Sequence, residues 1–202
     1  MTHRLALLVT GASGMALPRH VLAAMARHPD VGEIHLVVSK GAVQVLKHEM
    51  DLVGAAAEAL IAAADLDDES LDKIRTHREN ALDAPISSGS FPLTGTAIVP
   101  CSSGTLGALA TGAAGTLIHR AGAVALKERW PLVIGFRETP LTVIHLENLR
   151  RLAYLDATIL PPVPAFYIGG EDFTRFLDHY VLRVLDALGI HEPGKPGLRW
   201  PG

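Results

Sequence analysis

The sequence has little cysteine and no long apolar run. Cys101 is the single cysteine among 202 residues, which excludes an intramolecular disulfide and a cysteine-bound zinc cluster. No stretch approaches the roughly 18 apolar residues of a membrane-spanning helix. The first residues also lack the charged, apolar and small-residue order of a secretory signal. These absences predict a protein of a reducing compartment, which we expect to be the cytoplasm, with no membrane partner.

An excess of positive charge is also missing. The formal net charge is -3, so nothing in the composition indicates nucleic-acid binding. Hydrophobic residues make up 49% of the chain and charged residues 19%, which is enough for a well-buried core. The apolar share is high for one small domain, and we expect some of that surface to lie between subunits.

Short apolar runs alternate with helical patterns along the whole chain. Each run is bounded by turn residues and has the length of a buried strand. Residues 75–79 add a short segment that we interpret as an edge strand. The alternation predicts a single domain over residues 1–202, folded as a three-layer α/β/α sandwich around a mostly parallel sheet. The apolar runs are residues 5–9, 33–38, 97–99, 132–136 and 157–160.

Two of these runs lead into hydroxyl-rich or glycine-rich turns that open a helix. The first turn is Thr10–Gly14 and the second is Ser102–Thr105. Free backbone N–H groups at such a turn bind an anion, usually a phosphate. The first turn fits neither the G-x-G-x-x-G pattern nor a P-loop. We therefore predict a phosphate-bearing ligand shared by both turns, the alternative being ordinary strand-to-helix turns.

A charged pair, Arg137 and Glu138, follows the apolar run 132–136 directly. Ligands of open parallel sheets bind beyond the carboxyl ends of the strands, where this pair is expected. Pro140 holds Thr139 in an extended or turn conformation. The pair is either part of a ligand site or a surface ion pair.

We expect no metal site and no cysteine nucleophile. The acidic stretch Asp65–Glu69 lacks EF-hand spacing. His48 and Glu49 are adjacent on a helix and do not face each other. Cys101 stands at the end of a buried run with no evident His and Asn or Asp partners, so we interpret it as a packing residue.

Eight short segments in order resemble the flavin prenyltransferases of the UbiX family, and the likeness extends from about Leu5 to Ile190. The segments are Thr10-Gly11-Ala12-Ser13-Gly14, Ser39-Lys40, Ser88-Gly89-Ser90, Pro100-Cys101-Ser102 with Thr105-Leu106, Ala125-Leu126-Lys127-Glu128-Arg129, Arg137-Glu138-Thr139-Pro140, Ile144-His145-Leu146-Glu147-Asn148 and Pro164-Ala165-Phe166-Tyr167.

The resemblance implies a flavodoxin-like, Rossmann-like fold and a homododecamer with active sites at subunit interfaces. It implies a metal-independent transferase that joins a dimethylallyl group to N5 and C6 of reduced FMN. The donor would be dimethylallyl phosphate, or the pyrophosphate in some members. The product, prenylated FMN, would serve a UbiD-type decarboxylase as its cofactor.

The resemblance also assigns roles to single residues. Glu138, Glu49 and Ser13 would lie near the reacting groups. Lys127, Tyr167, Arg183 and, from a neighbouring subunit, Arg120 would surround the donor phosphate. The residues that would hold FMN are Gly11, Ala12, Ser13, Ser39, Ser102, Ser103, Gly104, Thr105 and Arg137.

The chain departs from the family pattern at two places. Leu82 stands where relatives commonly have Trp, and residues 168–170 replace a His-x-Pro segment. The first departure concerns an aromatic wall of the pocket, and the second concerns closure of the loop after Tyr167. We expect the tail, residues 191–202, to dock on a neighbouring subunit through Trp200.

Two other functions are consistent with the same fold. One is a flavin-dependent cysteine decarboxylase, although the catalytic His and substrate clamp of those enzymes are not evident. The other is a non-catalytic FMN-binding electron carrier, which would not need the Lys and Arg residues assigned to the donor.

Overall fold

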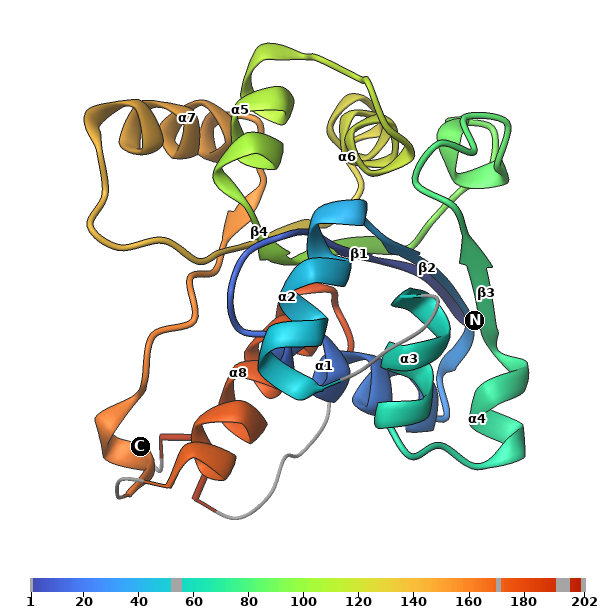
Figure 1. Ribbon diagram of the computed structural model, residues 1–202, viewed down its shortest axis with the longest axis vertical. Helices are drawn as coiled ribbons and strands as arrows, with labels where there is room; N and C mark the ends of the chain where they lie inside the picture. The colour runs from blue at the N-terminus through green and yellow to red at the C-terminus, as the bar shows by residue number, and fades with distance from the viewer. Residues whose placement is uncertain (1, 52–55, 170–171, 192–196, 201–202) are drawn as a thin grey trace.

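The computed structural model describes residues 2–51, 56–169, 172–191 and 197–200. Within them, six strands form one sheet in the order β3-β2-β1-β4-β5-β6, and all of its pairings are parallel (Figure 1). The inner order β2-β1-β4-β5-β6 is flavodoxin-like, and β3 extends it to the Rossmann order. The strands are β1 (His3–Val9), β2 (Val31–Val38), β3 (Ile74–His77), β4 (Gly95–Cys101), β5 (Leu132–Phe136) and β6 (Thr158–Ile159).

Helices cover both faces of this sheet and confirm the predicted three-layer sandwich (Figure 1). One face carries α5 (Ser103–Thr111), α6 (Leu117–Glu128) and α7 (Val143–Tyr154). The other carries α1 (Ala16–Arg27), α2 (Lys40–Met50), α3 (Ala56–Ala63) and α8 (Phe173–Ala187). The shorter helices are α4 (Asp68–Asp72), η1 (Pro85–Ser87) and η2 (Phe166–Ile168).

The strands are apolar along their whole length because each face of the sheet packs against helices. In β1, Leu5 and Leu7 belong to the core beneath α1 and α8. Ala6 and Leu8 point the other way, into the core beneath α5 and α6. All four are fully buried, so the continuous apolar run correctly predicted a central strand.

Side-chain caps decide where several helices begin. The sequence pattern of residues 113–128 predicts a helix that begins at Ala113, but α6 begins at Leu117, because the Thr116 hydroxyl accepts the backbone N–H of His119. Ser39 caps α2 and Ser102 caps α5 in the same way. Among the described residues, no helix combines the length and the apolarity needed to cross a bilayer.

A pair of histidines joins the edge strand β3 to β2. His35 Nδ1 lies 2.8 Å from His77 Nε2, and the Phe91 ring packs edge-on against His35 with centroids 5.2 Å apart. Burial disfavours the charged form of His35 more strongly than the Glu33 carboxylate favours it, and the pKa of the ring is lowered to about 4. The ring is therefore neutral at neutral pH. The contact between Phe91 and His35 holds the segment that follows η1 against β2.

The turns after β1 and β2 touch through two glycines. A Cβ added to Gly11 would lie 2.8 Å from the carbonyl carbon of Gly41, closer than real Cβ atoms approach a neighbour. Only a residue without a side chain lets the two turns meet at the carboxyl edge of the sheet.

Gly11→Ala is expected to push these turns apart and lower the unfolding temperature by several degrees, since forced backbone shifts cost about 1–3 kcal/mol. Gly115→Ala is the matched control, because a Cβ there meets no described atom within 4 Å. Thermal unfolding followed by circular dichroism measures both variants. Equal unfolding temperatures for the two would contradict the proposed contact.

Candidate active site

The site is built around the joint between β1 and β4, where the strand order reverses. The buried Thr10 hydroxyl donates to the Pro100 carbonyl oxygen at 2.8 Å and accepts the Ser102 backbone N–H at 2.7 Å. These two bonds fix both glycine- and hydroxyl-rich turns to one another. The convergence of the turns that the sequence predicted is therefore observed.

Glu49 lies at the amino end of α1. Its carboxylate accepts the backbone N–H groups of Gly14 at 3.0 Å and Met15 at 2.7 Å. Burial raises the pKa of Glu49, but hydrogen bonds from Ser13, Met15 and Gly14, together with the Arg137 charge, outweigh burial and lower it below 4.5. Glu49 therefore brings an ionised carboxylate next to the first turn.

Arg137 and Glu138 bridge the two turns from the end of β5. Arg137 Nε donates to the Ser13 carbonyl oxygen at 3.2 Å, and the Ser103 hydroxyl donates to Glu138 at 3.2 Å. Hydrogen bonds from the Thr139 backbone and Ser103 lower the pKa of Glu138, and the Arg137 charge lowers it further. Arg137 and Glu138 bond to different partners, so an isolated surface ion pair does not account for them.

These contacts gather most of the predicted site residues at one edge of the sheet, which we call the carboxyl-edge group. Its helix amino termini and Arg137 suit an anion, and its two ionised carboxylates suit proton transfer. The group consists of Gly11, Ala12, Ser13, Ser39, Glu49, Ser102, Ser103, Gly104, Thr105, Arg137 and Glu138.

A second group lies on α6. Arg120 Nε donates to the Ser87 carbonyl oxygen at 2.8 Å, and Lys127 pairs with Glu128 beside Gly89. Lys127 precedes β5 whereas Arg137 follows it. The length of the five-residue strand, about 16 Å, therefore separates the backbones of the two cations.

A third group lies on α8 and the segment before it. The Tyr167 hydroxyl is 3.1 Å from His179 Nε2, and its ring packs edge-on against Trp200 with centroids 5.2 Å apart. Arg183 Nη1 lies 3.4 Å from Asp186, which also forms a two-bond pair with Arg199.

The second and third groups lie on opposite faces of the sheet, because α6 and α8 belong to different cores (Figure 1). The four residues predicted to surround a donor phosphate are thus split into two pairs within one chain. The family resemblance placed only Arg120 on a neighbouring subunit. Since Lys127 shares its helix and its contact loop, both residues would come from the same subunit.

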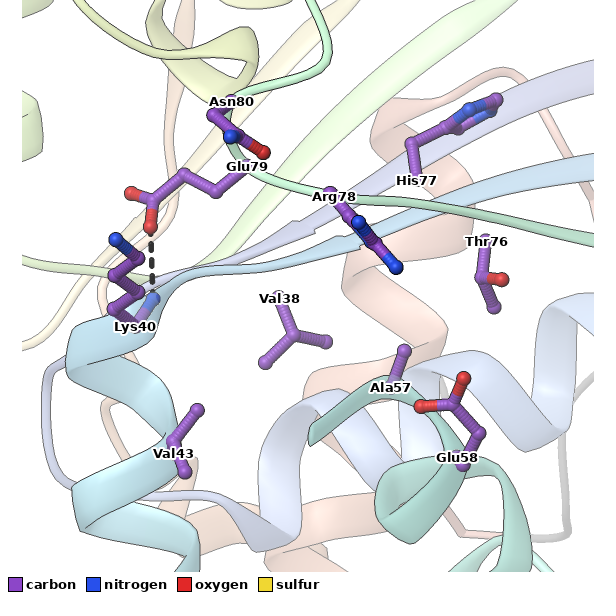
Figure 2. Close-up of a pocket in the computed structure, with 10 residues that line it drawn as sticks. All are labelled: Val38, Lys40, Val43, Ala57, Glu58, Thr76, His77, Arg78, Glu79 and Asn80. Carbon is purple, nitrogen blue, oxygen red and sulfur yellow. Dashed lines mark hydrogen bonds between the residues drawn. The ribbon is translucent and has the colours of Figure 1, made fainter. Parts of the chain in front are cut away.

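Two pockets adjoin these groups. The pocket in Figure 2 has a volume of about 460 Å³ and lies beyond β2 and β3, where the Lys40 backbone N–H donates to Glu79 at 2.8 Å. The other, of about 620 Å³, is walled by Pro164, Phe166 and Phe173. Pro162 and Pro164 place the proline-rich segment 161–164 in the wall of this second pocket.

Cys101 is buried, and burial raises the pKa of its thiol to about 12, which disfavours a thiolate nucleophile. Within the described ranges, no three His, Cys, Asp or Glu side chains come together in a way that would hold a metal ion.

The comparisons with known proteins point to one family. A model of the Flavoprotein family matches residues 1–175. The chain is 42% identical over 194 residues to the flavin prenyltransferase LpdB of Lactiplantibacillus plantarum, covering 96% of each protein. This chain belongs to the UbiX family of flavin prenyltransferases. Its sequence-based recognition as a UbiX-like protein is thereby confirmed.

Two crystal structures of UbiX proteins agree closely with its fold. AnUbiX, solved in complex with FMN and dimethylallyl pyrophosphate, has a TM-score of 0.85 and 39% identity, covering 100% of this chain and 99% of its own. A dodecameric FMN-dependent UbiX-like decarboxylase from Escherichia coli O157:H7 has a TM-score of 0.84 and 38% identity, covering 98% and 100%.

The sequence analysis of this UbiX-family chain did not single out His179. Its side chain is 7% exposed and it contacts Tyr167, which is twelve residues away. On a helix with an apolar face, the sequence pattern does not distinguish a histidine with a functional partner from an ordinary core residue. Only the fold shows that His179 is the partner of Tyr167. Leu82 is half exposed, so its side chain can contact another molecule.

Glu49→Gln is expected to lower stability by about 1 kcal/mol at neutral pH, through loss of the charge at the amino end of α1. Because the folded-state pKa is lowered, this contribution is complete above the unfolded value of 4.5 and is lost as pH falls through the folded value. The difference between wild type and variant should therefore shrink on acidification.

Chemical unfolding at several pH values measures this difference. Glu147→Gln, on the exposed surface of α7, makes the same charge change as a control. A wild-type advantage that stays constant from pH 7 to pH 3 would argue against an ionised Glu49 cap.

Proposed function

We propose that this protein transfers the dimethylallyl group of dimethylallyl phosphate to reduced FMN and so makes prenylated FMN. The observation that supports this most is the carboxyl-edge group, in which Arg137 and Glu138 link the two anion-binding turns. Full-length identity of about 40% to flavin prenyltransferases agrees with it.

The carboxyl-edge group fits FMN. The first turn of α5 presents backbone N–H groups, and a Cβ on Gly104 would meet no described atom within 4 Å, so a phosphate can approach this backbone. Arg137 holds the first turn through the Ser13 carbonyl oxygen and brings a positive charge. We assign Gly11, Ala12, Ser13 and Ser39, with the α5 turn, to flavin binding.

Reduced FMN supplies the nucleophilic N5 and C6 that take up the prenyl group. The chain has to stabilise the departing phosphate and move a proton. Arg183 and Tyr167 bind the phosphate from the α8 side of one subunit. Arg120 and Lys127 bind it from the α6 side of another subunit. The lowered pKa of Glu138 keeps its carboxylate ionised at neutral pH, which is the form that can take up a proton, and Glu49 with Ser13 lies beside the same turn.

A site shared between subunits requires an assembly, and we propose a homo-oligomer, as in the dodecameric relative. Several apolar side chains on or next to α7 are exposed, among them Val143 at 71%, Ile144 at 69% and Tyr154 at 76%. Such a patch on a folded chain indicates a protein contact.

We further propose that residues 1–202 form one flavoprotein domain in the cytoplasm, with the tail packed against a neighbouring subunit. Within its own chain, Leu198 of the tail is buried and Trp200 contacts Tyr167, but Trp200 is still 69% exposed and so has a free face for the neighbouring subunit. The donor is the monophosphate or the pyrophosphate, and a UbiD-type decarboxylase receives the product. The α6 and α8 cations favour this function over an electron carrier.

Anaerobic incubation with FMN, a reductant and dimethylallyl phosphate should release a flavin whose mass has increased by one five-carbon prenyl group. Mass spectrometry of the released flavin measures this. An unchanged mass with both the monophosphate and the pyrophosphate would contradict the proposed function.

Glu138→Gln should lower turnover by about 100-fold or more while leaving FMN affinity within about threefold, because it removes a proton acceptor and keeps the shape. Glu69→Gln, on the exposed surface of α4, makes the same charge change and should leave both quantities unchanged. Equal losses of turnover and FMN affinity in Glu138→Gln would assign the residue to flavin binding instead.

A further inference from the structure

A buried histidine stands directly behind Tyr167. His179 Nε2 lies 3.1 Å from the Tyr167 hydroxyl oxygen, and the two rings meet edge-to-face with centroids 5.8 Å apart. His179 is 7% exposed, whereas Tyr167 is 48% exposed. The hydroxyl therefore has a buried protein partner, while about half of the Tyr167 residue is open to solvent.

The other ring nitrogen indicates which group donates. His179 Nδ1 is buried and finds no hydrogen-bond partner among the described residues. Buried N–H donors without a partner are rarer than buried acceptors without one. The proton therefore belongs on Nε2, which donates to the Tyr167 oxygen. The Tyr167 O–H is then free to donate outward.

The helix geometry brings a cation to the same place. His179 and Arg183 are four residues apart on α8 and so lie on one face of the helix. Burial lowers the pKa of His179 and the Arg183 charge lowers it further, whereas Asp186 raises it. The ring is thus neutral at neutral pH and does not compete with Arg183 for an anion.

We infer that His179 is a positioning residue for the prenyl donor: it fixes the Tyr167 phenol so that its O–H and the Arg183 guanidinium face one phosphate. The inference rests on the proposed function, in which these two residues bind the donor. His179 itself does not touch the donor.

The affinity of the protein for the prenyl donor tests this inference in the absence of turnover. In enzyme loaded with oxidised FMN the flavin is not a nucleophile, so calorimetry with dimethylallyl phosphate reports binding alone. His179→Phe keeps the ring contact but removes Nε2, which donates the hydrogen bond to Tyr167. The dissociation constant of dimethylallyl phosphate should therefore rise about 5-fold. His179→Gln keeps an N–H at a similar reach and should stay within about twofold of wild type.

Tyr167→Phe should weaken donor binding at least as much, and adding His179→Phe to it should cause no further loss, since the two residues act as one unit. FMN affinity and the unfolding temperature serve as controls in every variant. In turnover, the Michaelis constant for the donor should rise in His179→Phe and return in His179→Gln.

Wild-type donor affinity in His179→Phe would overturn the inference, as would fully additive losses in the double variant or equal losses in the Phe and Gln variants. These results leave the proposed function intact as long as wild-type enzyme prenylates flavin. A wild-type enzyme that binds FMN but neither binds nor transfers the donor group would overturn both.

Discussion

The hydrogen bonds of the Thr10 hydroxyl are the constraint on which the rest of the site depends. A single buried oxygen ties the Pro100 carbonyl to the Ser102 backbone N–H, and so sets the turn after β1 against the turn after β4. Ser13, Ser103, Arg137 and Glu138 are all positioned relative to this joint. A hydroxyl can do this because it donates one bond and accepts another at the same atom. Valine, of the same shape, would leave the Ser102 N–H without this partner, and the Pro100 carbonyl would keep only the bond from the backbone N–H of residue 10.

The electrostatics of the carboxyl edge follow from this geometry. Two carboxylates and one guanidinium share a small region, and each carboxylate is stabilised in its charged form by backbone N–H groups and by Arg137. The charged forms are held by hydrogen bonds rather than by burial, which opposes ionisation. The charged side chains of the site are therefore ionised and held in position before a ligand binds.

The sequence pattern was sufficient to predict the sheet, the helices that cover it and the turns that meet at its carboxyl edge, and the family resemblance supplied the remaining members of the carboxyl-edge group. Apolar runs identify strands that are buried on both faces, and the residues that follow them must share one edge of a parallel sheet. Helix starts were predicted less well, because Thr116 decides one of them by a side-chain bond that a hydrophobic pattern does not show. The pairing of Tyr167 with His179 was beyond the sequence as well. It depends on how η2 packs on α8, and both residues occur in segments where aromatic packing alone is the simpler interpretation.

The separation of the cations onto two faces of one sheet has a consequence for control of the chemistry. No motion of side chains alone carries Lys127 through a six-stranded sheet to meet Arg183. With the proposed roles, a lone chain can hold a flavin but lacks half of the charge that a leaving phosphate needs. Dilution of the protein until its subunits separate would then lower its activity. With these roles, a newly made subunit would stay inactive until it joins others.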